Sequence, residues 1–299
     1  MPPIAPKIPR PPSLHAIRRS LAERFAQQHL LSAEHPVDLL GVMVDKHAGE
    51  SRVVVLVGPD SDPEALQELA DFHFAGHPFK VVTIDQTPAR SSGTASNGIA
   101  ICRQGSPEFG TIGGWFKMDR DRHTGQPVDQ SLFFGVSNNH VIGECNNSHR
   151  GDVLTDRNGV VVGRLHDLQA LYPTTANAID AAIFQVDPGI ALQWQPAAPR
   201  GWTGAQINFR VYKQGARTGY TEGIVTGIGA IVAELCGVRY HFKDIIAIKG
   251  TDGEFSAEGD SGSIVLTRNH QMVGLLFAKS GAYAYAARIK ELGAFNLRF

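Results

Sequence analysis

Cysteine is scarce in this chain of 299 residues, which contains only 3: Cys102, Cys145 and Cys236. An odd, sparse set without paired spacing disfavours the disulfide framework that staples small secreted proteins. We therefore expect all of them to be reduced thiols in a protein core, in a protein of the reducing cytoplasm.

Charge is also sparse and evenly divided. Only 19% of the residues are charged, and 28 basic against 29 acidic side chains leave a formal net charge of -1. A nucleic-acid-binding protein normally carries a basic surplus, so this balance predicts no nucleic-acid partner. A disordered chain would be poorer in hydrophobic residues, which make up 42% of this one.

Long hydrophobic runs are missing as well. The least polar stretch, residues 223–238, is rich in glycine, contains Glu234, and falls short of the roughly 20 apolar residues that cross a bilayer. The N-terminal segment MPPIAPKIPR lacks the continuous apolar stretch of about 7–15 residues that a signal peptide needs. We expect a soluble, cytoplasmic protein that has no membrane partner.

The first third of the chain predicts a small unit of its own. Residues 1–12 are rich in proline and predict an extended tail. Within residues 13–85, helical spacing predicts a first helix over 13–31, and a β-β-α-β unit with its helix over 63–74 follows. The small, polar stretch 86–97 predicts a linker, so we expect separate units on its two sides. This first unit is a candidate for binding a protein partner or regulating the rest.

The remainder, residues 98–299, consists mostly of short β-prone runs. Two sets of about six strands, separated by a polar connection that contains proline, predict two antiparallel β-barrels. We place barrel 1 at about 98–186, barrel 2 at about 205–287 and a C-terminal helix at about 288–294. The fold class is therefore mainly β, a double barrel behind an N-terminal helix and a small α/β unit. Strands do not alternate with long helices here, which argues against a nucleotide-binding fold.

The string EGDSGS, residues 258–263, is the most informative for chemistry. Small residues on both sides of Ser261 allow a tight turn that exposes its hydroxyl group. The same turn places the N–H groups of Gly259 and Ser261 where they can converge on a developing oxyanion. A serine alone is a weak nucleophile, so it needs a base and a carboxylate that orients the base.

His140 and Asp180 meet these needs best. His140, in FFGVSNNHVIG, closely follows an apolar β-prone run, where a side chain can be held rigidly. Asp180, in NAIDAAIFQV, begins an apolar strand, where an acid needs a buried partner. Asp152, Asp156 and Asp167 lie in turns rich in glycine and polar residues and suit the role less well.

These strings resemble a known family. GDSGS after SNNHV and AIDAAI, in the order His, Asp, Ser, resembles the chymotrypsin-like (trypsin-fold) serine peptidases. An α/β-hydrolase would present its serine before its acid and histidine. The string VYKQGARTGYTEGIV, residues 211–225, resembles the strand pair that opens the second barrel in bacterial trypsin-like enzymes without disulfides. GTIGGWF, NNHVI, NAIDAAI and GLLFAKS are similar to the trypsin-like domain of bacterial proteins and of the plant NARROW LEAF family, over about 200 of the 299 residues.

The resemblance implies a role for each residue of the site. Ser261 would attack a peptide carbonyl, His140 would take and return its proton, and Asp180 would orient the imidazole. The backbone N–H groups of Gly259 and Ser261 would bind the oxyanion. No cofactor is implied.

The resemblance also implies a specificity pocket. Its base would lie at Phe255, six residues before the nucleophile, and its wall would come from Phe277, Ala278 and Lys279. Because no acid stands at the base, we expect an apolar or small residue before the cleaved bond rather than a basic one.

Activation raises a further question. In trypsin-type enzymes, cleavage releases an N-terminal amine that pairs with the acid preceding the serine, here Asp260. No activation peptide is evident in this sequence. Either another group orders Asp260, or cleavage in the linker near Arg90 does.

The leading hypothesis is a serine endopeptidase whose partner is a protein or peptide substrate. The alternatives are a catalytically inactive or non-proteolytic peptide-binding scaffold and an esterase on the same fold. A metal site at Cys145 with His149 or His140 is disfavoured, because cysteine and histidine at ligand spacing are too few.

Overall fold

A computed structural model describes residues 39–47, 50–57, 73–74, 77–83, 89–90 and 100–298, the last range without residues 189 and 191. This part of the chain is mainly β-structure, as the sequence predicts. The predicted tail and the predicted helix over 13–31 lie outside the described residues. Within them, no helix combines the length and hydrophobicity that crossing a lipid bilayer requires.

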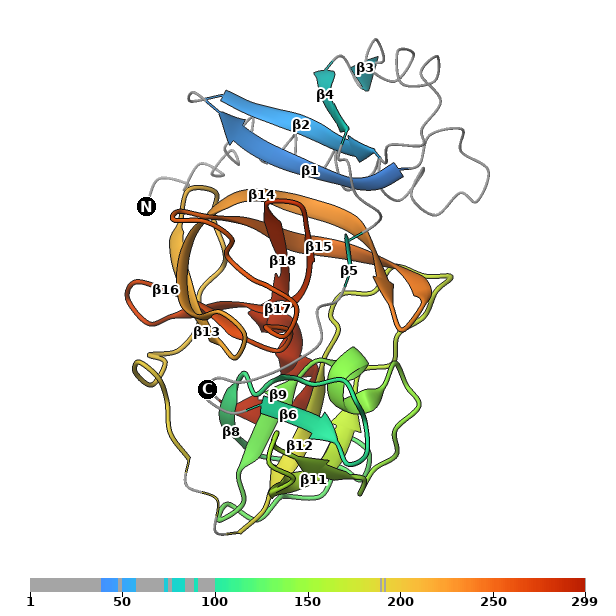
Figure 1. The fold of residues 1–299 in the computed structure, drawn as a ribbon, viewed down its shortest axis with the longest axis vertical. Coiled ribbons are helices and arrows are strands. Elements are labelled where there is room, and N and C mark those ends of the chain that lie inside the picture. Colours follow the sequence, from blue (N-terminus) through green and yellow to red (C-terminus); the bar gives the residue numbers. More distant parts are fainter. Residues whose placement is uncertain are drawn as a thin grey trace, which may run out of the picture.

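Barrel 2 is a closed ring of antiparallel strands (Figure 1). Its strands run in the order β13-β16-β17-β18-β15-β14, and pairing of β13 with β14 completes the ring. The strands are β13 (Arg210–Gly215), β14 (Gly219–Leu235), β15 (Val238–Gly250), β16 (Ile264–Thr267), β17 (Met272–Ser280) and β18 (Tyr283–Arg288). Each corresponds to an apolar run of the sequence, because side chains that fill the barrel must leave water.

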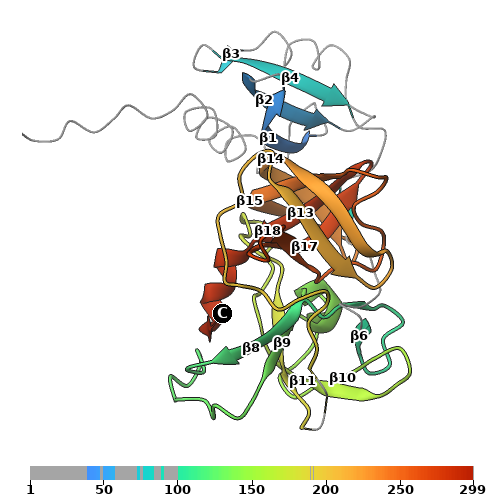
Figure 2. The same cartoon turned by 90° about the vertical axis from the view of Figure 1, so that its left-hand side faces the viewer.

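Barrel 1 is a curled antiparallel sheet in the order β19-β8-β9-β12-β11-β10-β6-β7. Its strands are β6 (Ala100–Arg103), β7 (Gly110–Thr111), β8 (Gly114–Met118), β9 (Phe134–Ser137), β10 (Val153–Thr155), β11 (Val161–Leu168), β12 (Ala182–Val186) and β19 (Leu297–Arg298). The helical segment η2 (Ile289–Phe295) leads from barrel 2 back to barrel 1, where β19 pairs with β8. Figure 2 shows η2 beside the lower barrel. The predicted double barrel is confirmed.

The N-terminal strands extend the sheet of barrel 2. They are β1 (Leu39–His47), β2 (Glu50–Val57), β3 (His73–Phe74), β4 (His77–Thr83) and β5 (Ala89–Arg90). β1 pairs antiparallel with β14, from Gly41 opposite Ile231 to Asp45 opposite Gly227, and the resulting sheet has 11 strands. The helix predicted over 63–74 lies outside the described residues except for its last two, which form β3. The linker predicted at residues 86–97 gave no indication that β1 pairs with β14.

The two barrels share one core. A cluster of buried apolar side chains includes Phe134 and Ile183 of barrel 1 together with Phe242 and Phe277 of barrel 2. Phe295 of η2 joins the same cluster. The barrels therefore meet as packed surfaces, and the residues at their junction are held from both sides.

The cysteines correct the sequence analysis. Cys145 and Cys236 form a disulfide, so the prediction of reduced thiols is wrong for these two. They lie 91 residues apart in the sequence and on different barrels, and spacing along the chain carries no signal of their proximity. Cys102 is a buried free thiol as expected, and burial raises its pKa. The cytoplasmic location, which rested partly on the cysteines, stays a prediction.

The core of barrel 1 depends on Phe184, and this can be tested. Its side chain is fully buried, its ring meets Trp115 edge to face at 6.1 Å, and a Cβ on Gly135 would lie only 2.1 Å from it. We expect Phe184→Ala to lower the free energy of unfolding by about 3–5 kcal/mol, because it leaves a cavity. Urea denaturation measures this. The control Val160→Ala, at a 53% exposed position, should change it by less than about 0.5 kcal/mol, and equal losses would contradict the assignment.

Candidate active site

His140 and Asp180 are brought together by two neighbouring strands. β9 pairs with β12, so that Ser137 lies opposite Ala182. His140 follows β9 in the helical turn η1 (Asn139–Gly143), and Asp180 precedes β12. The His140 N–H donates to Asp180 Oδ1 at 3.1 Å, and the imidazole Nδ1 hydrogen-bonds to Oδ2. The predicted pair is therefore in direct contact.

This contact assigns the roles of the two ring nitrogens. Asp180 is fully buried, and because a carboxylate oxygen only accepts, the tautomer that suits the contact has its hydrogen on Nδ1 and its lone pair on Nε2. His140 Nε2 is buried and has no hydrogen-bond partner among the described residues. A buried polar atom without a partner needs an explanation. One explanation is that the atom accepts a proton from a neighbouring group during a reaction.

Ser261 lies in a tight turn just before β16. Gly259 and Gly262 have φ angles of +116° and +97°, which favour glycine. A Cβ on Gly262 would come within 2.2 Å of Thr111 O and 2.6 Å of Ser137 Oγ, so only glycine fits there. Ser261 is buried, and its Oγ donates to Phe277 O at 3.4 Å. The small residues of GDSGS therefore form the predicted tight turn, but the prediction that this turn exposes the Ser261 hydroxyl is wrong, because Ser261 is 0% exposed.

Thr111 of barrel 1 fastens this turn. Its N–H donates to Ser261 O at 2.6 Å, and its Oγ1 donates to Gly259 O at 3.0 Å. Its own carbonyl oxygen accepts a hydrogen bond from Ser137 Oγ at 2.8 Å. Ser137 ends the strand that leads to His140. One residue thus ties the Ser261 turn of barrel 2 to the His140 segment of barrel 1.

The acid before the serine is neutralised from within the chain. Lys213 Nζ lies 3.2 Å from Asp260 Oδ2, and both side chains are fully buried. The ammonium group also donates to Thr218 Oγ1 and to Gly219 O at 3.0 Å. Burial lowers the pKa of Lys213, and the Asp260 carboxylate opposes this shift. The alternative in which another group orders Asp260 is therefore realised, by a residue that the sequence analysis missed.

The remaining lone pairs of Asp260 are satisfied as well. Oδ1 accepts from the N–H groups of Arg217 at 3.0 Å and Thr218 at 3.3 Å. Oδ2 accepts from the Thr218 hydroxyl at 2.7 Å and the Ala257 N–H at 3.0 Å. A signal for Lys213 did exist, since a lysine that ends the β-prone run INFRVYK needs a buried partner or a route to water.

The predicted pocket residues form two groups. Phe255, Phe277 and Ala278 are almost completely buried, and Phe255 packs in the core of barrel 2. Lys279 is partly exposed and pairs with Glu254 at 2.8 Å. The acid that stands next to Phe255 in the sequence is thus matched by a cation. Roles of these residues in substrate binding stay predictions.

Cys145, which was weighed as a metal ligand, has a different bonding partner. Cys145 is bonded to Cys236 and offers no thiolate. Over the described part of the chain, no group of at least three His, Cys, Asp or Glu side chains gathers where it could hold a metal ion.

Comparison with protein-family models gives no match, and comparison with curated proteins gives none either. Among solved structures, the chain is similar to a glutamic-acid-specific serine protease that uses a histidine triad in substrate binding, with 16% identity and a TM-score of 0.46. It is also similar to Thermobifida fusca protease A (14%, TM-score 0.49) and to a Nocardiopsis protease (17%, TM-score 0.47). Each alignment covers 70% of this chain and 98% of the other.

Likenesses this distant decide nothing about activity. The double barrel rests on the strand pairing described above, and the chemistry rests on the residues of the site. The resemblance to the NARROW LEAF family has no support among these structures.

The contribution of the buried Lys213–Asp260 pair to stability can be tested. We expect Lys213→Met to lower the free energy of unfolding by about 3–5 kcal/mol, because it leaves a buried carboxylate without its cation. Adding Asp260→Asn should restore part of the loss. Urea denaturation gives all the values, with Lys249→Met at an exposed position as the control. A loss at Lys213 no larger than that of the control would show that the pair is unimportant.

Proposed function

We propose that this protein is a serine endopeptidase in which Ser261 is the nucleophile, His140 the general base and Asp180 the residue that orients it. The observation that carries the proposal is the state of His140. Its Nδ1 is engaged by a buried carboxylate, and its Nε2 is buried without a partner among the described residues. At the junction of the two barrels, Thr111 donates hydrogen bonds to the turn that carries Ser261.

The reaction follows from this arrangement. Ser261 Oγ turns from Phe277 O toward Nε2 and attacks the carbonyl carbon of the substrate, while its proton passes to Nε2. Asp180 stabilises the imidazolium that forms. Collapse of the tetrahedral intermediate breaks the C–N bond, and Nε2 returns the proton to the leaving amine. A water molecule then hydrolyses the acyl-enzyme with the same proton transfers.

The N–H groups of Gly259 and Ser261 stabilise the negative charge of the tetrahedral intermediate by hydrogen bonds. These two residues flank Asp260, whose side chain is held by Lys213 and four further hydrogen bonds from Arg217, Thr218 and Ala257. Fixing Asp260 orders the peptide groups on both sides of it. Preorganised donors cost no rearrangement during the reaction, which is how such sites lower the barrier.

The substrate is proposed to be an extended peptide with an apolar or small residue before the cleaved bond. The residues expected around the pocket, Phe255, Phe277 and Ala278, are apolar and almost completely buried, and Lys279 neutralises Glu254. β17 also accepts a strand at this end, since β5 pairs with it antiparallel at Lys279. A peptide that adds to a strand gains main-chain hydrogen bonds in the same way.

Labelling by a fluorophosphonate probe tests the nucleophile. We expect the wild-type chain to be labelled at Ser261, and Ser261→Ala to show none. His140→Ala and Asp180→Asn should lower the labelling rate by about 10³–10⁴-fold, because the hydroxyl loses its base or the base its orientation. Mass spectrometry of the labelled peptide gives the site and the rate.

Ser263→Ala is the matched control, because Ser263 is an equally buried serine two residues away. It should keep the wild-type rate. An unlabelled wild-type chain that still binds peptides would replace the peptidase with a peptide-binding scaffold, and hydrolysis of small esters without any peptide would indicate an esterase.

Activation without cleavage is a second expectation. Because Lys213 already provides the cation for Asp260, the intact chain should be labelled as fast as any shortened form. Intact-mass spectrometry alongside the labelling time course checks this. Labelling that begins only after the chain is cut in the linker would contradict it.

A further inference from the structure

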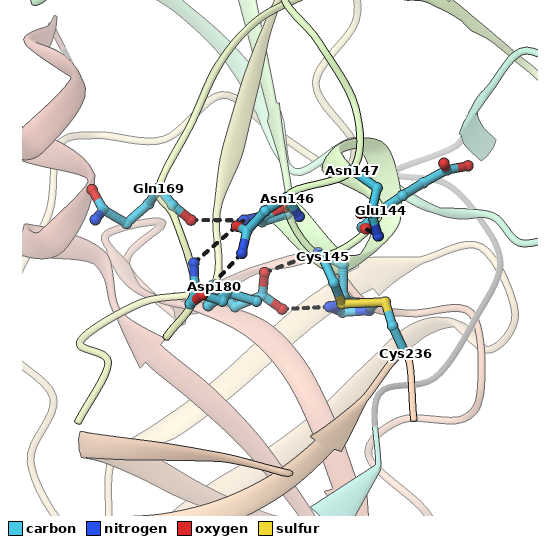
Figure 3. The surroundings of a disulfide bond; sticks show 10 residues. Glu144, Cys145, Asn146, Asn147, Gln169, Asp180 and Cys236 are labelled. Atoms are coloured by element: carbon cyan, nitrogen blue, oxygen red, sulfur yellow. Dashed lines mark hydrogen bonds and ion pairs between the residues drawn. A yellow bond between two sulfur atoms is a disulfide. The ribbon is translucent and has the colours of Figure 1, made fainter. Parts of the chain in front are cut away.

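The disulfide joins the segment that carries His140 to the other barrel. Cys145 follows η1 and is 7% exposed, whereas Cys236 is exposed at the tip of the hairpin between β14 and β15. Figure 3 shows the bond beside Asp180 and Asn146. The backbone around Cys145 has an unusual conformation.

That chain segment is strained. Glu144, Cys145 and Asn146 have φ angles of 46°, 53° and 79°, so three consecutive residues other than glycine are left-handed. A residue with a Cβ is unfavourable at such angles, asparagine least so. A strained turn of this kind persists only where its surroundings hold it. The disulfide is attached to the middle residue of the turn.

The turn is bound directly to the residue before His140. Asn146 N donates to Asn139 Oδ1 at 3.0 Å, and Asn139 Nδ2 donates to Asn146 Oδ1 at 2.7 Å. Asn139 is fully buried and precedes His140 in η1. A shift of the turn would therefore move the backbone that carries the imidazole.

The same side chains reach the segment of Asp180. Asn139 Nδ2 also donates to Gln169 O at 2.7 Å, and Gln169 N donates to Ala181 O at 2.9 Å. Asn146 Nδ2 donates to Leu171 O at 2.9 Å, and Leu171 N donates back to Asn146 Oδ1 at 2.9 Å. The network thus runs from the disulfide to both members of the His140–Asp180 pair.

We propose that the Cys145–Cys236 disulfide is a positioning link for catalysis, and that its reduction by a dithiol slows turnover without unfolding the protein. The inference rests on the proposed peptidase function. While the bond is intact, barrel 2 holds the left-handed turn, and the turn holds His140 and Asp180 in register with Ser261. When it is broken, the turn relaxes and the pair loses that register.

The exchange begins at Cys236, which is the exposed residue of the pair. A thiolate of the dithiol attacks Cys236 Sγ, the S–S bond breaks, and its electron pair leaves on Cys145 Sγ, which then takes up a proton. The second thiol of the reagent attacks the mixed disulfide and releases Cys236 as a thiol. Two protein thiols and one disulfide of the reagent result, so the electrons balance.

Turnover of the full chain before and after reduction tests the link. With a p-nitrophenyl ester as the substrate, we expect reduction to lower kcat by about 10- to 100-fold with little change in KM, since small misplacement of catalytic groups has effects of this size. Cys236→Ser should show the low kcat in either redox state. Cys102→Ala, which removes the free thiol, should behave as wild type. Reoxidation of the wild type should restore kcat.

A rescue separates positioning from general stability. In the Cys236→Ser background, Glu144→Gly should recover part of kcat, because glycine adopts the left-handed angle without strain, whereas Glu144→Ala should not. If breaking the disulfide lowers the urea midpoint of unfolding but leaves kcat unchanged, the disulfide only stabilises the fold, and the proposal is overturned.

Two further measurements keep the outcomes distinct. Alkylation of the denatured, unreduced chain should modify Cys102 alone, and modification of all three cysteines would overturn the proposal by showing that the bond does not form. Amide hydrogen exchange should accelerate at residues 139–146 on reduction, whether or not the chain is active. An oxidised chain without labelling at Ser261 would refute the peptidase function, while unchanged exchange and kcat on reduction would refute the link.

Discussion

The contact on which the rest of the site depends is the one between Thr111 and the Ser261 turn. Through it, a residue of barrel 1 binds two carbonyl oxygens of barrel 2 while accepting a hydrogen bond from Ser137. Glycine at position 262 is required because the two chains come this close. The candidate site thus exists only where the barrels meet, and the shared apolar core keeps them together.

Two buried carboxylates flank this junction, and each would be costly without a partner. Asp180 hydrogen-bonds to His140, and Asp260 pairs with Lys213. Each buried carboxylate is therefore held in a fixed orientation by its partner. The first fixes the imidazole of His140, and the second fixes the backbone around Ser261. The disulfide adds a third constraint, because it is attached to the middle residue of the left-handed turn that follows η1.

Much of the fold could be predicted from the sequence, because alternating apolar runs and the turns between them are local patterns. The strands of both barrels follow from these patterns, and the order of SNNHV, AIDAAI and GDSGS along the chain pointed to His140 and Asp180. Their direct contact depends on the pairing of β9 with β12. Lys213 and the cysteine pair could not be predicted in the same way. Their partners lie far away in the sequence, and nothing next to them indicates which residue they meet.

The sequence by itself determined which chemical groups are present and which segments are strands, since both depend on a residue and its neighbours along the chain. Only the tertiary structure decided the pairings: β1 with β14, Lys213 with Asp260, and Cys145 with Cys236. The physical reason is that each pairing becomes favourable only after folding has removed its members from water or brought them within bonding distance. Proximity of that kind arises from the packing of the whole barrel.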